Sequence, residues 1–475
     1  MTGRKLAVLF PGQGAFDGTA LRTASERHPQ VNQVFKAIDL VTQEQFSAQL
    51  TDILFGGEPP TIDLLLAEQP WVSQLAIFGA DVAAYQVLAW HGLRPDVLVG
   101  HSLGEIAALV AANAFTVEDG ARIVAERVRA VADQDLAAGR MVALAAGAAR
   151  VQKIVDLVED DGLAVAVENH DGQTVVSGPG GAIDSVVGIA GQLRIGTVEV
   201  KSPFPFHTPM LAAAVPRFAE RLRDIPQQPL DMPVFSPILG RHYRDDDNLA
   251  DLLATHLVTP VLFSAGVRTL YDDGVRQFVE AGCLGALSSL VRKAGTGESV
   301  TTWPSILLRN GELALDGTLA DLRRHGLADG SVGERLAALV APDIQADVFS
   351  RFWATAGGEI TKLIHDRLAE FQPGGAVEPT VTETPSLDRD ALGAEIKAIY
   401  SEALEYPEEV FTDDVLLEAE LGVDSVKQLE LLTRVTQRYS LPVKDGNFWL
   451  ADHDTMGKII DAVHGILRGA VPASA

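Results

Sequence analysis

The chain has 475 residues, a formal net charge of −26 and a hydrophobic fraction of 47%. Its length predicts about three domains, and its negative charge disfavours nucleic acid and anionic membranes as partners while leaving room for basic proteins. The single cysteine, Cys283, excludes an internal disulfide framework and a cysteine-based zinc site. No metal site is expected. Because we find neither an apolar run of about 18 residues nor a signal peptide, we expect a cytoplasmic protein without a membrane span.

The first predicted elements alternate between strands and helices. They are a strand over 6–10, a helix over 74–92, a strand over 97–99, and helices over 105–112 and 117–133. This order suits an α/β fold in which a parallel sheet is covered by helices.

The turn Gly100-His101-Ser102-Leu103-Gly104 joins the second of these strands to the helix that follows it. Strand, tight turn and helix are the setting of a G-x-S-x-G nucleophile elbow, in which Ser102 is held with its hydroxyl exposed. On the pattern alone, an ordinary glycine-rich turn before a helix fits equally well. The loop Pro11–Gly14 is similarly either a plain strand-to-helix turn, which the loop alone favours, or a source of backbone N–H donors.

Residues 133–202 have a different sequence pattern. Short β-prone runs lie at 141–146, 164–168, 174–177 and 197–200, with helix-like stretches at 150–159 and 182–193. This β-α-β-β-α-β order predicts a ferredoxin-like insertion. Beyond it, helices are predicted over 209–222, 249–256 and 264–272, and strands over 233–236 and 277–282.

The C-terminal part divides into three segments. Residues 311–371 carry an apolar stripe at helical spacing, which predicts a packing face rather than a ligand site. Residues 372–387 contain prolines and glycines but no aromatic residue, which is typical of a flexible linker. Residues 388–470 are acidic and helical in pattern, and they predict a small all-α domain with its own core.

A serine nucleophile needs a positioned base, because its hydroxyl is a weak nucleophile at neutral pH. His101 adjoins Ser102, but neighbours at a tight turn point apart, which disfavours it as the base. His207 lies in a rigid apolar segment, Ser202–Met210, that contains three prolines and two phenylalanines. That setting suits a base and also a buried structural histidine.

Taken together, the motifs of residues 6–310 resemble the acyltransferase domains of polyketide and fatty acid synthases, the malonyl-CoA:acyl carrier protein transacylase family. The matching pieces are Phe10–Gly14, Gln74, Gly100–Glu105, Arg127, Met141, Asn169, Val176–Gly178, His207 and Phe278–Gly282. The resemblance implies a hydrolase-like α/β core with a ferredoxin-like subdomain.

The same resemblance implies the roles of the site residues. His207 would take the proton of Ser102 and return one to the leaving thiol. The backbone N–H groups of Gln13 and Leu103 would form the oxyanion hole. Arg127, which has the family spacing, would bind the free carboxylate of a malonyl-type acyl group in a pocket that Gln74 lines. Arg129, two residues further along the same predicted helix, is its competitor, and a solvated helix arginine is the alternative for either residue.

The chain departs from the family around the histidine. The segment reads Phe204-Pro205-Phe206-His207, whereas the common malonyl and methylmalonyl forms read His-Ala-Phe-His and Tyr-Ala-Ser-His. Phe206 matches the malonyl form, in which bulk excludes an α-substituent, whereas Phe204 and Pro205 match neither form. Cys283 stands where the family usually has proline.

The acidic segment 388–470 carries the sequence Leu421-Gly422-Val423-Asp424-Ser425-Val426, which resembles acyl carrier proteins. The resemblance implies that Ser425 carries 4′-phosphopantetheine, attached from coenzyme A by a phosphopantetheinyl transferase. The alternative is a serine or aspartate that only caps a helix. An acidic carrier suits docking to basic patches on ketosynthase or other synthase subunits.

These observations predict an acyltransferase (1–310) joined by a helical extension (311–371) and a linker (372–387) to its own carrier domain (388–470), a helical bundle. We expect ping-pong transfer from an acyl-CoA through an acyl-serine to a carrier thiol in polyketide, antibiotic or fatty acid biosynthesis. Malonyl is the leading acyl group and an unusual dicarboxylic unit the second. The alternatives are an acyl hydrolase of the same fold, which the presence of Arg127 disfavours, and a non-catalytic scaffold, which the joint presence of Ser102, His207 and Gln13 disfavours.

Overall fold

The structure is a computed structural model. It describes residues 5–68, 70–134, 139–294, 300–330, 336, 346–369, 389–404, 407, 410–415, 417, 421, 423, 431, 434, 435, 438 and 455–469. The chain forms two compact units, Met1–Gly358 and Glu359–Ala475, and each is described by itself. The predicted linker 372–387 and Ser425 lie outside the described residues.

A six-stranded sheet forms the centre of the first unit, with strand order β10-β9-β1-β2-β7-β8. Its strands are β1 (Lys5–Phe10), β2 (Val97–Gly100), β7 (Val234–Ser236), β8 (Arg241–His242), β9 (Val275–Glu280) and β10 (Thr301–Trp303). All neighbours are parallel except β7 and β8. Parallel strands covered on both faces are apolar throughout, as Leu6–Phe10 and Val97–Val99 are.

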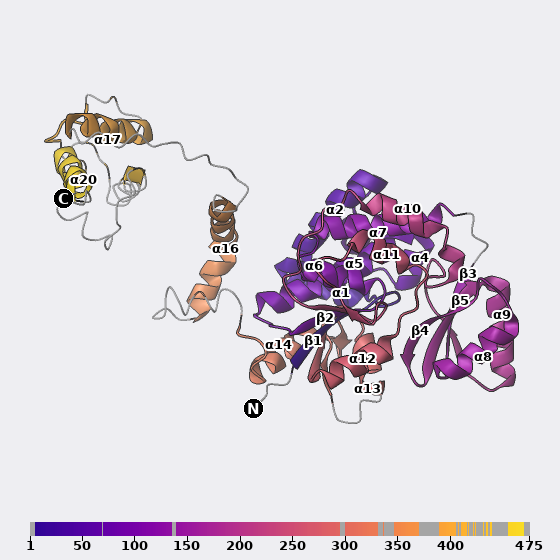
Figure 1. Ribbon diagram of the computed structural model, residues 1–475. Helices are drawn as coiled ribbons and strands as arrows, with labels where there is room; N and C mark the ends of the chain where they lie inside the picture. The colour runs from indigo at the N-terminus through magenta and orange to yellow at the C-terminus, as the bar shows by residue number, and fades with distance from the viewer. Residues whose placement is uncertain are drawn as a thin grey trace, which may run out of the picture. The chain divides into compact units, whose positions relative to one another are not determined.

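Helices lie on both sides of this sheet, some of them packed on other helices. They are α1 (Gly18–Arg27), α2 (Pro29–Phe46), α3 (Leu50–Phe55), α4 (Ile62–Glu68), α5 (Pro70–Trp90), α6 (Gly104–Ala111), α7 (Val117–Ala132), α10 (Ala214–Leu222), α11 (Leu249–Thr255), α12 (Phe263–Asp272), α13 (Ala286–Lys293) and α14 (Ala314–Arg324). Figure 1 shows α5 and α6 on one side of the sheet and α12 and α13 on the other.

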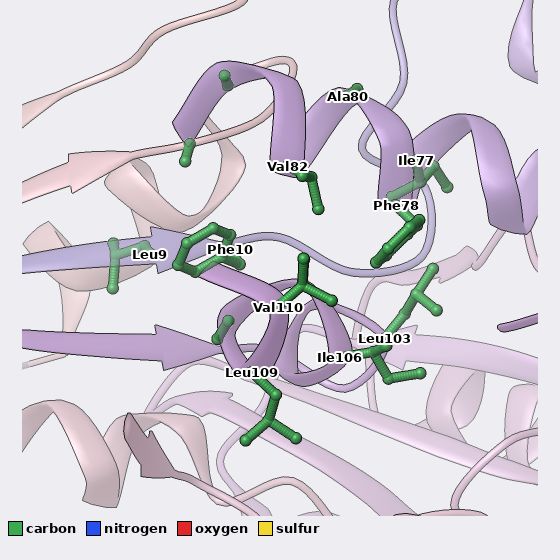
Figure 2. Packing of buried hydrophobic residues seen from close by; sticks show 14 of the residues in the cluster. Leu9, Phe10, Ile77, Phe78, Ala80, Val82, Leu103, Ile106, Leu109 and Val110 are labelled. Carbon is green, nitrogen blue, oxygen red and sulfur yellow. The ribbon is translucent and has the colours of Figure 1, made fainter. Parts of the chain in front are cut away.

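Helix α5 is mostly apolar around its circumference, and it is buried in the core. It contacts α6 and β1 through a cluster that includes Phe10, Phe78 and Ile106 (Figure 2). A helix that is hydrophobic all round belongs inside a protein or a membrane. By length and composition α5 would suffice to cross a membrane, a run that the sequence analysis misses, but 83% of its most apolar stretch is buried within the protein.

A smaller four-stranded antiparallel sheet follows α7, with strand order β4-β5-β3-β6. Its elements are β3 (Gly139–Leu144), α8 (Ala148–Val158), β4 (Ala164–His170), β5 (Gln173–Pro179), α9 (Gly180–Gln192) and β6 (Thr197–Glu199). Both helices lie on the same side of the sheet and enclose a separate core (Figure 1). The order β-α-β-β-α-β is the one expected for this segment.

The small sheet is joined to the larger part of the unit at its β4 edge. Val261 receives a hydrogen bond from the backbone N–H of Glu168 at 2.9 Å and donates one to the carbonyl of Ala166 at 2.9 Å. This segment, which lies between α11 and α12, therefore pairs with β4, and its Leu262 donates to the carbonyl of Pro237, just after β7, at 3.2 Å.

The structure differs from the sequence-based expectations in several elements. The helix expected over 209–222 is a 3-10 turn, η1 (Pro209–Leu211), followed by α10. The two-residue strands β8, β11 (Leu308–Arg309) and β12 (Glu312–Leu313) and the short β10 were not expected, because so few residues show no periodicity. In α16 (Ala346–Ala369), Phe349 of the apolar stripe is buried against Trp353, but Phe352 and Leu363 are at least half exposed.

The second unit has its own hydrophobic core. Its described helices are α17 (Arg389–Leu404) and α20 (Met456–Gly469), and its core includes Ile396, Tyr400 and Ile460. At its surface Arg389 bonds both Asp413 and Asp461.

Candidate active site

Ser102 lies at the tip of the turn that joins β2 to α6. Its backbone has a left-handed φ of 56°, an uncommon conformation for a residue with a side chain. Both flanking glycines are needed for close approach. A Cβ at Gly100 would lie 2.2 Å from the Cα of Glu105, and one at Gly104 would lie 2.1 Å from the carbonyl oxygen of Phe10. The turn therefore has the geometry of a nucleophile elbow.

The structure brings His207 to Ser102, although the two residues are 105 positions apart. Ser102 Oγ lies 2.6 Å from His207 Nε2, and His207 Nδ1 lies 2.8 Å from the carbonyl oxygen of Thr259. Because a carbonyl only accepts, Nδ1 carries the proton and Nε2 is free to accept from the serine hydroxyl. Burial and, next, the positive charge of Arg127 lower the pKa of His207 to about 3, so the imidazole is neutral at physiological pH.

The loop after β1 lies against the elbow. A Cβ at Gly12 would meet the carbonyl oxygen of His101 at 2.4 Å, so only glycine allows this approach. Among the described residues, the backbone N–H groups of Gln13 and Leu103 have no hydrogen-bond partner. Two unpaired donors beside a serine nucleophile have the chemistry of an oxyanion hole.

Arg127 is a buried cation on α7, with 4% of its surface exposed. Its Nη1 donates to Gln74 Oε1 at 2.6 Å, and its guanidinium stacks on the ring of Phe206 at 3.7 Å from the centroid. The Gln74 amide in turn donates to Gln13 Oε1, and Gln13 Nε2 donates to the carbonyl of Lys201 at 3.1 Å. Burial lowers the pKa of Arg127 to about 9, which leaves it charged at neutral pH.

The competitor Arg129 lies elsewhere. It is one-third exposed, pairs with Glu126 at 2.9 Å and donates to the carbonyl of Gln45 at 2.8 Å. The two arginines differ in partner as well as position, because Arg129 has a carboxylate and Arg127 an uncharged amide. Buried charges are normally paired with an opposite charge, so Arg127 is the one suited to receive an anion.

The aromatic residues before His207 form one wall of the site. Phe206 is buried and meets Phe204 edge to face, with ring centroids 5.8 Å apart. Pro205 packs against Gly139 at the start of β3, where a Cβ would approach the proline ring to 2.4 Å. Cys283 is buried and pairs with Ile306 in an isolated parallel bridge.

The His101 imidazole has Asn169 as its hydrogen-bond partner. Its Nε2 lies 3.1 Å from Asn169 Oδ1 on β4, and Asn169 donates to Gln173 at 2.9 Å. Sequence reasoning missed Thr259, the carbonyl partner of His207. No pattern marks it, because its backbone oxygen is used rather than its side chain.

An α/β fold with a serine on such an elbow is found in serine-dependent acyl-transfer enzymes and hydrolases. Residues 8–309 match the acyl transferase domain family, and the chain belongs to this family. Residues 394–463 match the phosphopantetheine attachment site family, so the chain joins an acyltransferase domain to a C-terminal carrier.

Two curated relatives illustrate the family. The chain is 30% identical over 297 residues to malonyl CoA-acyl carrier protein transacylase of Bacillus subtilis (strain 168), covering 61% of this chain and 90% of the relative. It is 29% identical over 322 residues to spectinabilin polyketide synthase system protein NorB of Streptomyces orinoci, covering 67% of this chain but only 15% of that protein. The chain thus spans a small part of the multidomain relatives that it matches.

Solved structures agree on the α/β fold. Malonyl CoA-acyl carrier protein transacylase from Clostridium perfringens superposes with a TM-score of 0.59 at 28% identity, covering 68% of this chain and 98% of that one. The acyltransferase domain from the second module of the salinomycin polyketide synthase gives a TM-score of 0.61 at 24% identity, covering 72% and 79% of the two chains.

Proposed function

We propose that this protein transfers a malonyl-type acyl group from a CoA thioester, through an acyl-serine on Ser102, to the thiol of an acyl carrier protein. The observation that carries the proposal is the buried guanidinium of Arg127, which has an amide rather than an anion as its partner. It lies beside His207, the base that meets Ser102 at 2.6 Å. A free carboxylate on the acyl group would supply the missing negative charge.

The first half-reaction follows from the geometry of the site. His207 Nε2 takes the proton of Ser102 as Oγ attacks the thioester carbonyl carbon. The N–H groups of Gln13 and Leu103 donate to the oxyanion that forms there. The C–S bond then breaks, and the imidazolium returns its proton to the sulfur of CoA. The carbonyl of Thr259, which accepts from Nδ1 at 2.8 Å, keeps the ring oriented throughout.

In the second half-reaction Ser102 releases the acyl group to a thiol. 4′-Phosphopantetheine on Ser425 supplies that thiol when it is bound. The described residues fit a carrier, because Val423 and Leu431, on either side of Ser425 in the sequence, are buried in the core of the second unit. His207 accepts the proton of the incoming thiol and returns it to Ser102 when the acyl group leaves.

The domain boundaries and partners belong to the same proposal. Residues 133–202 form a ferredoxin-like subdomain of the acyltransferase (1–310), and residues 388–470 form a helical-bundle carrier behind the linker 372–387. The partners are its own carrier domain and other acyl carrier proteins, a phosphopantetheinyl transferase, and ketosynthase or other synthase subunits in the cytoplasm. The acidic charge of residues 388–470 supports docking to basic enzyme surfaces.

Intact-protein mass spectrometry tests the proposal. The full chain without phosphopantetheine is incubated with malonyl-, methylmalonyl- and acetyl-CoA, and the mass added to Ser102 is measured. We expect malonyl to be added most, and Ser102→Ala to abolish it. With phosphopantetheine attached, malonyl should appear on the carrier. Rapid release of free malonate in place of carrier loading would instead identify an acyl hydrolase.

A further inference from the structure

Behind the serine and histidine lies a chain of three buried polar side chains, Glu105, Tyr243 and His256. The hydroxyl of Tyr243 donates to Glu105 Oε2 at 2.7 Å. His256 Nε2 lies 3.1 Å from the same hydroxyl oxygen. Because the hydroxyl has only one proton, which Glu105 receives, His256 Nε2 is the donor to Tyr243. All three side chains are at least 95% buried, and none of them hydrogen-bonds the side chain of Ser102 or His207, which bond each other.

The two ends of this chain are attached to the two halves of the catalytic pair. Glu105 is in the first turn of α6, three residues after Ser102. His256 is the residue that ends α11 and begins the segment that holds His207. In that segment the carbonyl of Leu257 accepts from the backbone N–H of His207 at 2.8 Å, and the carbonyl of Thr259 accepts from Nδ1. Tyr243, which follows β8, therefore connects the elbow to the segment 256–259, whose carbonyls bond His207.

Burying these polar groups costs free energy unless they stay hydrogen-bonded. This cost holds the three side chains in one arrangement. Burial raises the pKa of Glu105 to about 8, while the hydrogen bond from Tyr243 opposes this shift. Burial lowers the pKa of His256 to about 3, so it is a neutral donor. Within the described part of the chain Glu105 Oε1 has no hydrogen-bond partner, but Oε2, the Tyr243 hydroxyl and His256 Nε2 are paired with one another. These paired groups allow few alternative arrangements, because a displacement would leave a further buried polar group without a partner.

We propose that Glu105, Tyr243 and His256 form a brace that sets the distance and orientation between Ser102 and His207. They are positioning residues, since they act on the pair through the backbone of the elbow and of residues 256–259. The brace takes the place of a carboxylate directly behind the histidine, because His207 Nδ1 donates to a backbone carbonyl. This inference rests on the proposed function insofar as Ser102 and His207 are the catalytic pair.

The test removes the central hydroxyl in the full chain, with Tyr243→Phe, and uses Tyr85→Phe as the matched control. Tyr85 is a half-buried core tyrosine whose hydroxyl meets the sulfur of Met232 at 3.5 Å, outside the brace. The rate of covalent modification of Ser102 by a fluorophosphonate, which needs an activated serine but no acyl pocket, is followed by intact mass. We expect Tyr243→Phe to slow it by about tenfold or more, because small misplacements of reacting groups are costly. Tyr85→Phe should react at the wild-type rate.

A second measurement distinguishes a positioning role from a merely structural one. For acylation by malonyl-CoA, Tyr243→Phe should lower kcat while KM stays at the wild-type value, because Arg127 and its pocket are untouched. His256→Gln, whose amide can still donate to Tyr243, should retain most of the rate, whereas His256→Leu should not. Equal fluorophosphonate rates in Tyr243→Phe and wild type would overturn the brace, as would equal loss in His256→Gln and His256→Leu. If the wild type reacts with the fluorophosphonate but not with malonyl-CoA, the proposed function fails and the brace stands.

Discussion

The two ends of the site are complete to different degrees. At the serine end, Ser102, His207 and the carbonyl of Thr259 form a continuous series of hydrogen bonds within the protein. At the other end, the partners of the buried Arg127 are the neutral amide of Gln74 and the aromatic ring of Phe206. The first end is finished before any substrate arrives, whereas the second holds a desolvated positive charge with no counter-charge among these partners.

This difference suggests that the acyl-transfer step and the choice of acyl group depend on different parts of the site. A thioester of any acyl group presents the same carbonyl carbon to Ser102, so the serine end does not discriminate. Removing the guanidinium from water costs free energy in the free protein, and this cost is offset only when an anion binds. On the proposed function, Arg127 carries the preference for a dicarboxylic acyl group, and its charge also lowers the pKa of His207 at the serine end.

The largest effect is expected at the serine end. Ser102→Ala and His207→Ala should each lower acyl transfer by roughly 10³-fold or more, because the members of such a pair act as a unit. Transfer of malonyl and acetyl groups should fall together, as measured by product formation with both CoA thioesters. A His207→Ala variant that lost only malonyl transfer would break the comparison.

Arg127→Ala should produce a selective loss. Removing a charge-assisted contact from a closed pocket costs about 2–4 kcal/mol, or roughly 30- to 700-fold in malonyl transfer. Acetyl transfer should be spared or improved, because acetyl has no carboxylate. The control is Arg129→Ala, which removes an arginine on the same helix that already pairs with Glu126. Equal losses with malonyl and acetyl would make Arg127 structural.

Phe206→Ser should have a smaller effect, on branched acyl groups. The guanidinium of Arg127 stacks on the phenyl ring at 3.7 Å from its centroid, and on the proposed function this ring occupies the space that an α-methyl group would need. Discrimination of a methyl group in an apolar pocket is limited to about 1–3 kcal/mol. Competition between malonyl- and methylmalonyl-CoA should shift towards methylmalonyl. An unchanged ratio would move the selectivity to another residue, and Phe204→Ala would then be the variant to measure.

The smallest effect is expected from pH. An ordinary histidine, with a pKa near 6.5, would be only about 3% neutral at pH 5. Because burial and Arg127 lower the pKa of His207 to about 3, acetyl transfer should stay nearly level between pH 7 and pH 5. The free energy of unfolding, in contrast, should depend on pH. His207 binds a proton near pH 6.5 in the unfolded chain but not in the folded one, so the free energy of unfolding decreases as the pH falls below 6.5. An acetyl transfer rate that halves near pH 6.5 would contradict the neutral base.

Local patterns predicted much of this molecule, and long-range contacts account for what they missed. The elbow around Ser102 and the order of elements in 139–199 follow from residues close together in the sequence. From the residues alone, Arg127 and Arg129 are alternatives, because both lie on one helix, and only packing decides which is buried. Tyr243 and His256 carry no motif, and their relation to Glu105 depends on where β8 and α11 end in space.

Both members of the proposed catalytic pair occupy left-handed backbone conformations, with φ of 56° at Ser102 and 61° at His207. Each such residue costs the fold on the order of 1–3 kcal/mol. Glycine at either position would relieve that cost and end the chemistry. In evolutionary terms, the substitutions that would stabilise this site most readily are therefore the ones that would abolish its activity. A copy of this gene freed from selection for activity should lose Ser102 and His207 early while its core remains intact.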